Sequence, residues 1–285
     1  MERKIILSAD STCDLGDTLK ERYHVHFFPF HILLGENSYI DGKDICPEDL
    51  YKAWREKHQL PKTSAITMME YEEYFRPWVE QGYDVIHVNL GSAISSAHQN
   101  CVAAATRLGH VYPVDSCSLS TGTGLLVIHA AEMIEAGVEA PAIQKELQKL
   151  SQKVSASFVL DTLEFMRAGG RCSAVAAFGA NLLHLKPSIL VQNAKNGAMC
   201  VGKKYRGSME KVLEEYVRYE LEGREDLVLD RVFITHSGCP DAHIQLVKRL
   251  VAKLQPFKEI FVTQASCTIS CHCGPGTLGV LFVTK

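Results

Sequence analysis

Short apolar segments with the pattern of β-strands alternate with helical patterns through the first half of the chain. The expected strands cover residues 4–9, 84–90 and 111–114, and the helices that follow them cover residues 14–22, 96–108 and 119–136. Short strands separated by helices of about a dozen residues are typical of a parallel sheet covered by helices on both faces. The first half therefore predicts an α/β fold, whose ligand-binding loops lie at the carboxyl ends of its strands.

The rest of the first half carries weaker signals. Residues 25–34 are expected to be extended, with a turn at residues 35–38 before Tyr39-Ile40. The expected helices cover residues 47–58, 69–81 and 141–154. Pro47 fits the first position of a helix, because its missing N–H would have no partner there. Thr63 and Ser64 fall between two of these helices and are expected on a loop.

The second half is distinguished by a hairpin signal. Residues 188–191 and 199–204 flank Asn196-Gly197, a dipeptide that favours the tight turns of β-hairpins. Further strands are expected over residues 157–160, 231–236, 259–262 and 278–283, and helices over residues 161–168, 173–185, 208–222 and 241–254. A hairpin mixed with crossover helices predicts a mixed or antiparallel sheet in this half.

These two patterns divide the chain into two expected domains. An N-terminal α/β domain with a parallel sheet and flanking helices covers residues 1–154, and a C-terminal α/β domain with a mixed or antiparallel sheet covers residues 155–285. A chain of 285 residues is long enough for two domains or for one large one. No low-complexity linker separates the halves, so the two domains are expected to share a substantial interface.

Charge and hydrophobic patterning narrow the function classes. The 30 Lys and Arg residues nearly balance the 33 Asp and Glu residues, for a formal net charge of −3. This balance gives no electrostatic case for nucleic acid or an anionic membrane as the main partner. The apolar run near the N-terminus is too short for a signal peptide, and no segment approaches the length of a membrane span. We therefore expect a cytoplasmic protein.

Ten cysteines raise the question of disulfides or a metal. They are scattered through apolar and small-residue surroundings, and no Cys-x-x-Cys pair occurs. The one dense cluster consists of Cys267, Cys271, His272 and Cys273, and no second ligand pair accompanies it. We expect reduced thiols, no metal and no cofactor.

Three hydroxyl-bearing segments could bind a ligand. Asp10-Ser11-Thr12 follows the first expected strand and could either face a ligand or cap the next helix. The segment 91–97 follows another strand and opens a helix, where free N–H groups and the helix dipole favour an anion. An ordinary capping serine is the alternative reading of this segment. Thr63-Ser64 supplies two neutral donors, although a turn or cap explains them as well.

Standard nucleotide and hydrolase motifs are absent. The chain contains no Gly-x-Gly-x-x-Gly and no P-loop, which disfavours a nucleotide site. It also lacks Gly-x-Ser-x-Gly, the nucleophile elbow of α/β-hydrolases. Near the C-terminus, His272 precedes Gly274-Pro275-Gly276 and an apolar strand. This pattern is either a tight turn with an incidental histidine or a histidine held beside a pocket.

Taken together, these landmarks resemble the DegV-like family of fatty-acid-binding proteins over essentially the whole chain. Any one of them is weak, but their order and spacing are specific. They are Ala9 to Leu15, Thr63-Ser64, Gly91 to Gln99, Val114-Asp115-Ser116, Gly122 to Leu126, Asp161 to Phe165, Gly169 to Ser173, Leu185-Lys186-Pro187, Lys204 to Gly207 and His272-Cys273-Gly274-Pro275-Gly276.

The resemblance implies a two-domain fold, related to the substrate domain of dihydroxyacetone kinase, with a long-chain fatty acid held between the domains. It implies a partner protein rather than an enzyme, one that presents the acyl carboxylate to a separate ATP-dependent bacterial fatty acid kinase for acyl-phosphate formation. By motif match, the residues that bind the carboxylate are Thr63, Ser95, the Ser96 backbone and His272, and the residues that face the kinase are Arg206 and, second, Arg171.

The chain departs from the family pattern at two places. The family often has Thr-Ser-Gln-Pro where this chain has Thr63-Ser64-Ala65-Ile66. It often has Gly-Leu-Ser-Gly where this chain has Ala93-Ile94-Ser95-Ser96. Losing both glycines narrows the backbone freedom beside the carboxylate, while the hydroxyl of Ser95 is retained.

A rival hypothesis from another class is a hydrolase or acyl transferase that acts on a lipid ester. It would use Ser95 or Ser116 with His272, and Asp10 or Asp115 would orient the histidine. A purely regulatory or scaffolding protein is a third reading. A retained ligand without turnover would distinguish lipid binding from both.

Overall fold

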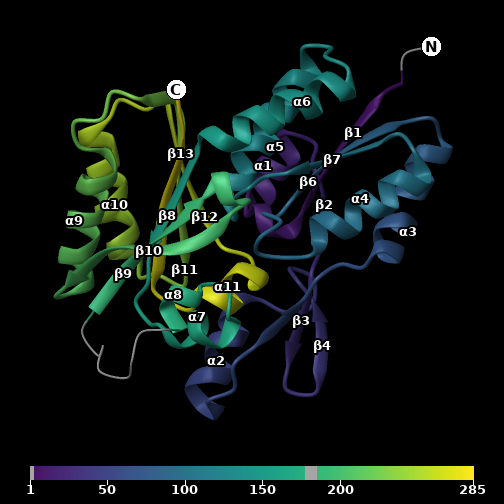
Figure 1. Cartoon of the computed structure of the whole chain (residues 1–285). Helices are drawn as coiled ribbons and strands as arrows, with labels where there is room; N and C mark the ends of the chain where they lie inside the picture. Colours follow the sequence, from purple (N-terminus) through teal and green to yellow (C-terminus); the bar gives the residue numbers. More distant parts are fainter. Residues whose placement is uncertain (1–2, 177–184) are drawn as a thin grey trace.

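Three β-sheets organise the computed structural model, which describes residues 3–176 and 185–285 (Figure 1). The first sheet has four parallel strands in the order β2-β1-β6-β7. Its strands are β1 (Ile5–Asp10), β2 (His26–Phe28), β6 (Asp84–Asn89) and β7 (Val111–Asp115). This sheet confirms the parallel α/β architecture expected for the first half.

Two pairs of helices cover the parallel sheet. One pair is α3 (Met68–Glu80) and α4 (Ala97–Leu108), the other is α5 (Thr121–Glu135) and α6 (Ala140–Leu150), and α1 (Gly16–Arg22) follows β1. A capping box starts α3, because the Thr67 hydroxyl accepts from Glu70 N and the Thr67 N–H donates to the Glu70 carboxylate. Helix α5 is buried over most of its length, since it lies between the parallel sheet and strands of the second sheet.

The second sheet is mixed, as the hairpin signal predicts. Its order is β10-β9-β8-β13-β11-β12, and only the β11–β12 pair is parallel. Its strands are β8 (Val154–Val159), β9 (Leu185–Gln192), β10 (Ala198–Arg206), β11 (Leu227–Ser237), β12 (Glu259–Gln264) and β13 (Thr277–Thr284). Alternate residues of β11 serve two cores: Val232 and Ile234 pack under α9 (Met209–Leu221) and α10 (Asp241–Leu254), whereas Phe233 packs toward the first half.

A small antiparallel sheet, β4-β3-β5, was not expected from the sequence. It consists of β3 (His31–Leu34), β4 (Asn37–Ile40) and β5 (Lys62–Ser64). Thr63 and Ser64 therefore lie on a strand, not on a loop, because they pair with Ile32 and His31. The segment expected to be extended over residues 25–34 forms two strands. Its two parts, β2 and β3, join different sheets and are separated by Pro29 and Phe30.

Four helices lie near the small sheet and the second sheet: α2 (Pro47–Lys57), α7 (Glu164–Gly169), α8 (Ser173–Ala176) and α11 (Cys267–Cys273). Helix α11 packs against α2 and α7, and it was missed in the sequence. The helix expected over 173–185 begins correctly at Ser173, but Leu185 belongs to β9, and residues 177–184 lie outside the described part. The helix expected over 141–154 ends at Leu150, because a 3-10 turn leads into β8 at Val154.

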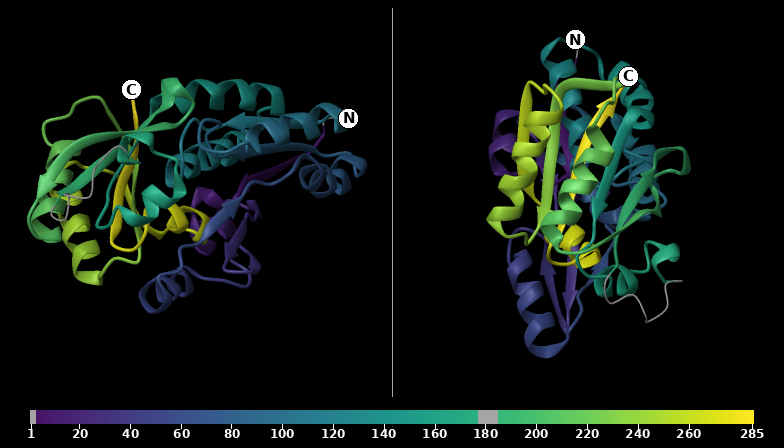
Figure 2. Two further views of the ribbon diagram at one scale, coloured as in Figure 1. Left: turned by 60° about the horizontal axis from the view of Figure 1, so that its bottom comes forward. Right: turned by 90° about the vertical axis from the view of Figure 1, so that its left-hand side faces the viewer.

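The two halves of the chain lie side by side (Figure 2), and one hydrophobic core connects them. Val88 and Leu126 of the first half belong to the same buried cluster as Phe158 and Leu281 of the second sheet. A second cluster fills the space between the second sheet, α9 and α10. The extensive contact between the halves agrees with the lack of a linker in the sequence.

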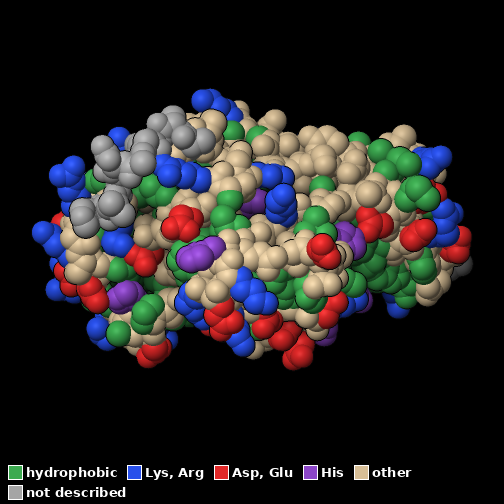
Figure 3. All heavy atoms as spheres, turned by 90° about the horizontal axis from the view of Figure 1, so that it is seen from below, with side chains coloured by type: hydrophobic (Ala, Val, Ile, Leu, Met, Phe, Trp, Pro, Cys, Tyr) green, Lys and Arg blue, Asp and Glu red, His purple; other side chains and the backbone are tan. Residues whose placement is uncertain are grey.

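Seen from below, the surface carries Lys and Arg side chains interspersed with Asp and Glu (Figure 3). This mixture is consistent with the small formal net charge of −3. No helix of residues 3–176 and 185–285 has the length and apolar character needed to cross a bilayer.

Candidate functional site

An apolar cavity lies between the parallel sheet, the second sheet and α11. About 70 Å³ of it can hold the centre of a water-sized sphere, and all the non-atom space among its lining residues, open solvent included, amounts to about 810 Å³. Its apolar walls include Phe30, Leu119, Phe158, Met166, Met199 and Leu281. These side chains come from both halves of the chain, so the cavity exists only where the halves meet.

Four of the polar side chains that line this cavity come from separate elements: Thr63 on β5, Ser95 between β6 and α4, Arg171 after α7, and His272 on α11. The Thr63 Oγ1 atom lies 2.9 Å from His272 Nε2, within hydrogen-bond distance. Three of the four residues predicted to bind a carboxylate therefore line one cavity, and two of them are in direct contact.

His272 is held as a neutral imidazole. Burial, together with the nearby positive charge of Arg171, lowers its pKa to about 4. Its Nδ1 atom is buried and has no hydrogen-bond partner among the described residues. The ring lies against Gly169, where an added Cβ would be only 2.1 Å from Nδ1. A glycine at this position is therefore a requirement of the histidine's placement.

Ser95 lies in the loop that leads from β6 into α4. Its Oγ accepts a hydrogen bond from Ala97 N at 3.2 Å, so the side chain caps the first turn of the helix. The loop is fixed to the second half of the chain, because Ala93 N donates to Asn196 O at 3.0 Å. The end of α4 that faces the cavity is the positive end of its dipole, which favours an anion.

Arg171 is the one charged side chain among the cavity-lining residues that the structure describes. Its Nη1 donates to Gly169 O at 2.8 Å, and its Nε lies 3.4 Å from Ile94 O, next to Ser95. Sequence reasoning assigned this arginine to a partner surface and missed its place at the cavity. The neighbouring Gly169-Gly170 signal marked the end of a helix but not the closeness of Arg171 to His272.

Two other predicted residues lie apart from this group. Ser96 is exposed and does not line the cavity. Arg206 is exposed at the end of β10 and does not line the cavity either. The position of Arg206 on the surface leaves it open to a partner.

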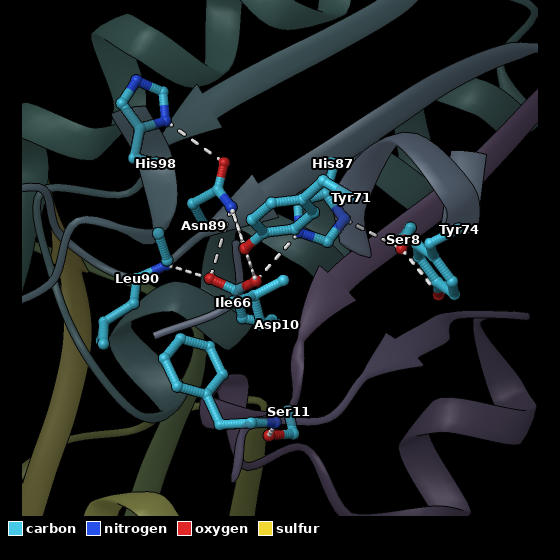
Figure 4. Close-up of polar contacts among 12 residues, drawn as sticks. Ser8, Asp10, Ser11, Ile66, Tyr71, Tyr74, His87, Asn89, Leu90 and His98 are labelled. Atoms are coloured by element: carbon cyan, nitrogen blue, oxygen red, sulfur yellow. Dashed lines mark hydrogen bonds and ion pairs between the residues drawn. The ribbon is translucent and has the colours of Figure 1, made fainter. Parts of the chain in front are cut away.

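A buried polar network surrounds the Asp10 carboxylate (Figure 4). The Asp10 carboxylate accepts from Tyr71 OH at 2.7 Å and from Leu90 N at 2.8 Å, and His87 Nε2 lies 3.0 Å from it. Ser8 Oγ lies 2.9 Å from His87 Nδ1, so Ser8, His87 and Asp10 have the connectivity of a catalytic triad. All three are fully buried, which denies them a substrate. The network instead fixes Leu90, where β6 meets the cavity.

The convergence required by a hydrolase is not present among the described residues. Asp10 is bonded to His87, not to His272. Asp115 accepts from the backbone N–H groups of Ser92 and Cys117. The prediction that either acid orients His272 is therefore wrong, and Ser116 is likewise turned away, with its hydroxyl donating to Ser118 O.

The thiols near His272 are buried. Burial raises the pKa of both Cys271 and Cys273, that of Cys273 to about 12. Protonated thiols are poor metal ligands and poor nucleophiles. Within the described ranges, no group of three or more His, Cys, Asp or Glu side chains is arranged to hold a metal ion.

Comparison with known proteins places the chain in a family. The model of the family described as "Uncharacterised protein, DegV family" matches residues 4–285. The chain belongs to the DegV family. Protein DegV of Bacillus subtilis is 27% identical over 289 residues, with 99% of both chains covered. A DegV domain-containing protein of Clostridium perfringens is 26% identical over 287 residues, again with 99% of both covered.

Solved structures of the DegV family share the fold. That of a fatty-acid-binding DegV family protein from Thermus thermophilus has a TM-score of 0.87 at 30% identity and covers 99% of this chain and 100% of its own. DegV of Bacillus subtilis, a fatty acid binding protein, has a TM-score of 0.81 at 26% identity with both chains fully covered. These similarities confirm the DegV-like α/β fold.

Proposed function

We propose that this DegV family protein binds one long-chain fatty acid in the cavity between its halves. The observation that carries the proposal is the lining of the cavity: apolar walls, neutral donors at Thr63, Ser95 and His272, and one cationic side chain, Arg171. A fatty acid matches this lining, because it is an apolar chain with one anion at its end. The fatty-acid-binding DegV proteins of similar structure support the assignment.

The energetics favour a ligand of this kind. Burying about 14 methylene groups at roughly 0.8 kcal/mol each contributes a gross free energy of about 11 kcal/mol. Association and ordering of the acyl chain offset much of this gain. A buried carboxylate without hydrogen bonds would cost more than the chain returns, so the donors at Thr63, Ser95 and His272 decide whether the acid binds.

A neutral His272 suits this role. Because its pKa lies near 4, the imidazole carries one N–H and one free nitrogen at neutral pH. Its contact with Thr63 links two donors that can turn toward the same oxygen. Ser96, which the family resemblance pairs with Ser95, is proposed only through its backbone at the start of α4.

We further propose that the protein presents the bound carboxylate to a separate ATP-dependent fatty acid kinase in the cytoplasm and has no catalytic activity of its own. Arg206, exposed at the end of β10, supports a docking role, because a surface charge acts mainly on encounter and register. Arg171 could serve both carboxylate binding and kinase docking, since it lines the cavity and is exposed.

The test is direct. Freshly purified protein is analysed by native mass spectrometry, and a denaturing organic extract is analysed for free acids. We expect about one fatty acid per chain and no hydrolysis of p-nitrophenyl or thioester substrates. Folded protein without any acyl species, and without affinity for added palmitic acid, would refute the proposal.

A further inference from the structure

The beginning of α11 is held by two carboxylates from the other half of the chain. The Asp14 carboxylate accepts from Ser266 N at 2.9 Å. The Asp41 carboxylate accepts from Cys267 N at 2.9 Å and Thr268 N at 3.2 Å, and from the Thr268 hydroxyl at 2.7 Å. Both aspartates are buried. Neither was singled out for this role in the sequence.

Helix α11 depends on these contacts. It has seven residues, and a helix of that length is unstable by itself because nucleation is costly. Its first N–H groups have no partner inside the helix, and a negative charge beside them is favourable. The same helix carries His272 at its far end, so the position of its first turn sets the position of the imidazole.

We propose that Asp41 is a positioning residue for the carboxylate site: by fixing the first turn of α11, it holds His272 against Thr63. The inference rests on the proposed function and names the residue that maintains its geometry. The Asp41 side chain is itself oriented by Ser11, whose hydroxyl donates to Oδ2 at 2.9 Å. Asp41 is absent from the cavity lining, so it acts through α11 and not on the ligand.

The two aspartates differ in a way that supplies a matched control. At Asp41, Oδ2 receives the Ser11 hydroxyl, the Thr268 N–H and the Thr268 hydroxyl. An amide nitrogen at Oδ2 would face the Thr268 N–H, and one at Oδ1 would face the Cys267 N–H, so either orientation of the amide sets donor against donor. Asp41→Asn therefore breaks the arrangement while it preserves shape.

At Asp14 the hydrogen-bond pattern tolerates an asparagine. Oδ1 receives Ser266 N, and Oδ2 receives the Ser120 hydroxyl at 2.6 Å. An asparagine keeps both contacts, because its oxygen accepts from Ser266 N and its nitrogen donates to the Ser120 oxygen. Asp14 has φ of 51°, in the left-handed region, which asparagine tolerates. Asp14→Asn is thus expected to leave α11 in place.

The experiment compares wild type, Asp41→Asn and Asp14→Asn for binding of palmitic acid and of hexadecanol, which shares the chain but lacks the carboxylate. We expect Asp41→Asn to lose roughly tenfold in affinity for the acid and little for the alcohol. Asp14→Asn should match wild type for both ligands. In a His272→Ala background, Asp41→Asn should cause no further loss. An equal loss for acid and alcohol, or none for the acid, overturns the proposal.

Two further measurements keep the outcomes distinct. If Asp41→Asn fails to fold, Ser11→Ala, which removes one donor to Asp41, replaces it, and unchanged acid affinity there overturns the proposal. If wild type binds no palmitic acid, the proposed function fails, and the imidazole ¹⁵N spectrum decides the inference alone. The His272 resonances, assigned with His272→Ala, should shift in Asp41→Asn and stay unchanged in Asp14→Asn. Unshifted resonances in Asp41→Asn overturn the proposal.

Discussion

The side chains of His272 and its neighbours determine what the cavity can hold. A neutral imidazole, two hydroxyls and a guanidinium line the same cavity, and the imidazole contacts one of the hydroxyls. None of these groups needs to lose or gain a proton near neutral pH to receive a carboxylate. The same set lacks an acid that would orient His272 as a general base, which separates binding from hydrolysis.

Removing single donors tests this arrangement. Thr63→Ala, Ser95→Ala and His272→Ala should each weaken palmitic acid binding about 10- to 100-fold, because each removes a hydrogen bond to a charged group of roughly 1.5–3 kcal/mol. Pairs of substitutions should be non-additive, since the three donors share one anion. Isothermal titration with palmitic acid and hexadecanol measures the effect. Unchanged acid affinity in all three variants would refute the assignment of the site.

Gly169 gives a second prediction at this scale. Gly169→Ala places a methyl carbon 2.1 Å from His272 Nδ1 in the unrelaxed structure, so the imidazole must move away. We expect a loss of acid affinity comparable to that of His272→Ala, about tenfold or more. The control is the double variant, in which the alanine at 272 leaves room for the methyl group. If Gly169→Ala weakens binding further in that background, the clash with His272 is not the cause.

Among the elements, α11 was the hardest to predict and matters most. Its sequence, Cys-Thr-Ile-Ser-Cys-His-Cys, lacks strong helix formers. The helix is held by Asp14 and Asp41, far away in the chain, and by packing against α2 and α7. A local signal did exist: Ser266 caps the helix by accepting from Ile269 N, and Gly274 follows its end. The strand β5 had no such signal, because three residues become a strand only by pairing with β3.

The elements with long, regular patterns were predictable. The alternation of strands and helices indicated the parallel sheet, and Asn196-Gly197 indicated the hairpin of β9 and β10. Thr63, Ser95 and His272 entered the predicted site through motifs, but the meeting of Arg171 with His272 depends on the packing of α7 against α11. Local sequence does not encode such packing.

The buried Asp14 makes stability depend on pH. Burial raises its pKa from 3.8 to about 7, so the folded state holds this proton more tightly than the unfolded chain does. The stabilisation of the folded state by protonated Asp14 is fully present below about pH 4, and it is lost as the pH rises through about 7. Asp14→Asn removes this dependence. The unfolding free energy of the variant minus that of wild type should therefore be higher at pH 8 than at pH 5, by roughly 2–4 kcal/mol.

Urea unfolding of both proteins at pH 5 and pH 8 measures this difference. Subtracting the wild-type unfolding free energy from that of Asp14→Asn at each pH cancels the contributions of the other titrating groups. An equal difference in unfolding free energy at the two pH values would show that Asp14 stays ionised in the folded state.

For the whole molecule, binding and docking are expected to be separable. Arg206→Ala should leave palmitic acid affinity within about twofold of wild type, because Arg206 does not line the cavity. Turnover with a cognate fatty acid kinase should fall, most strongly at low salt, where surface charges act over longer distances. Lys195→Ala, which likewise removes one positive charge from an exposed position, is the control. Equal losses of lipid affinity and turnover would place Arg206 in the binding site instead.

The contacts that hold α11 also set when the site can exist. Asp41 meets residues 226 positions later in the chain, Asp14 meets a residue 252 positions later, and Thr63 meets His272 across 209 positions. Closing loops of this length comes late in folding, after local helices and hairpins have formed. On the ribosome, the first half can build its parallel sheet while the cavity still lacks a wall. Under the proposed function, a newly made chain therefore binds its fatty acid only after its last helix has been synthesised and docked.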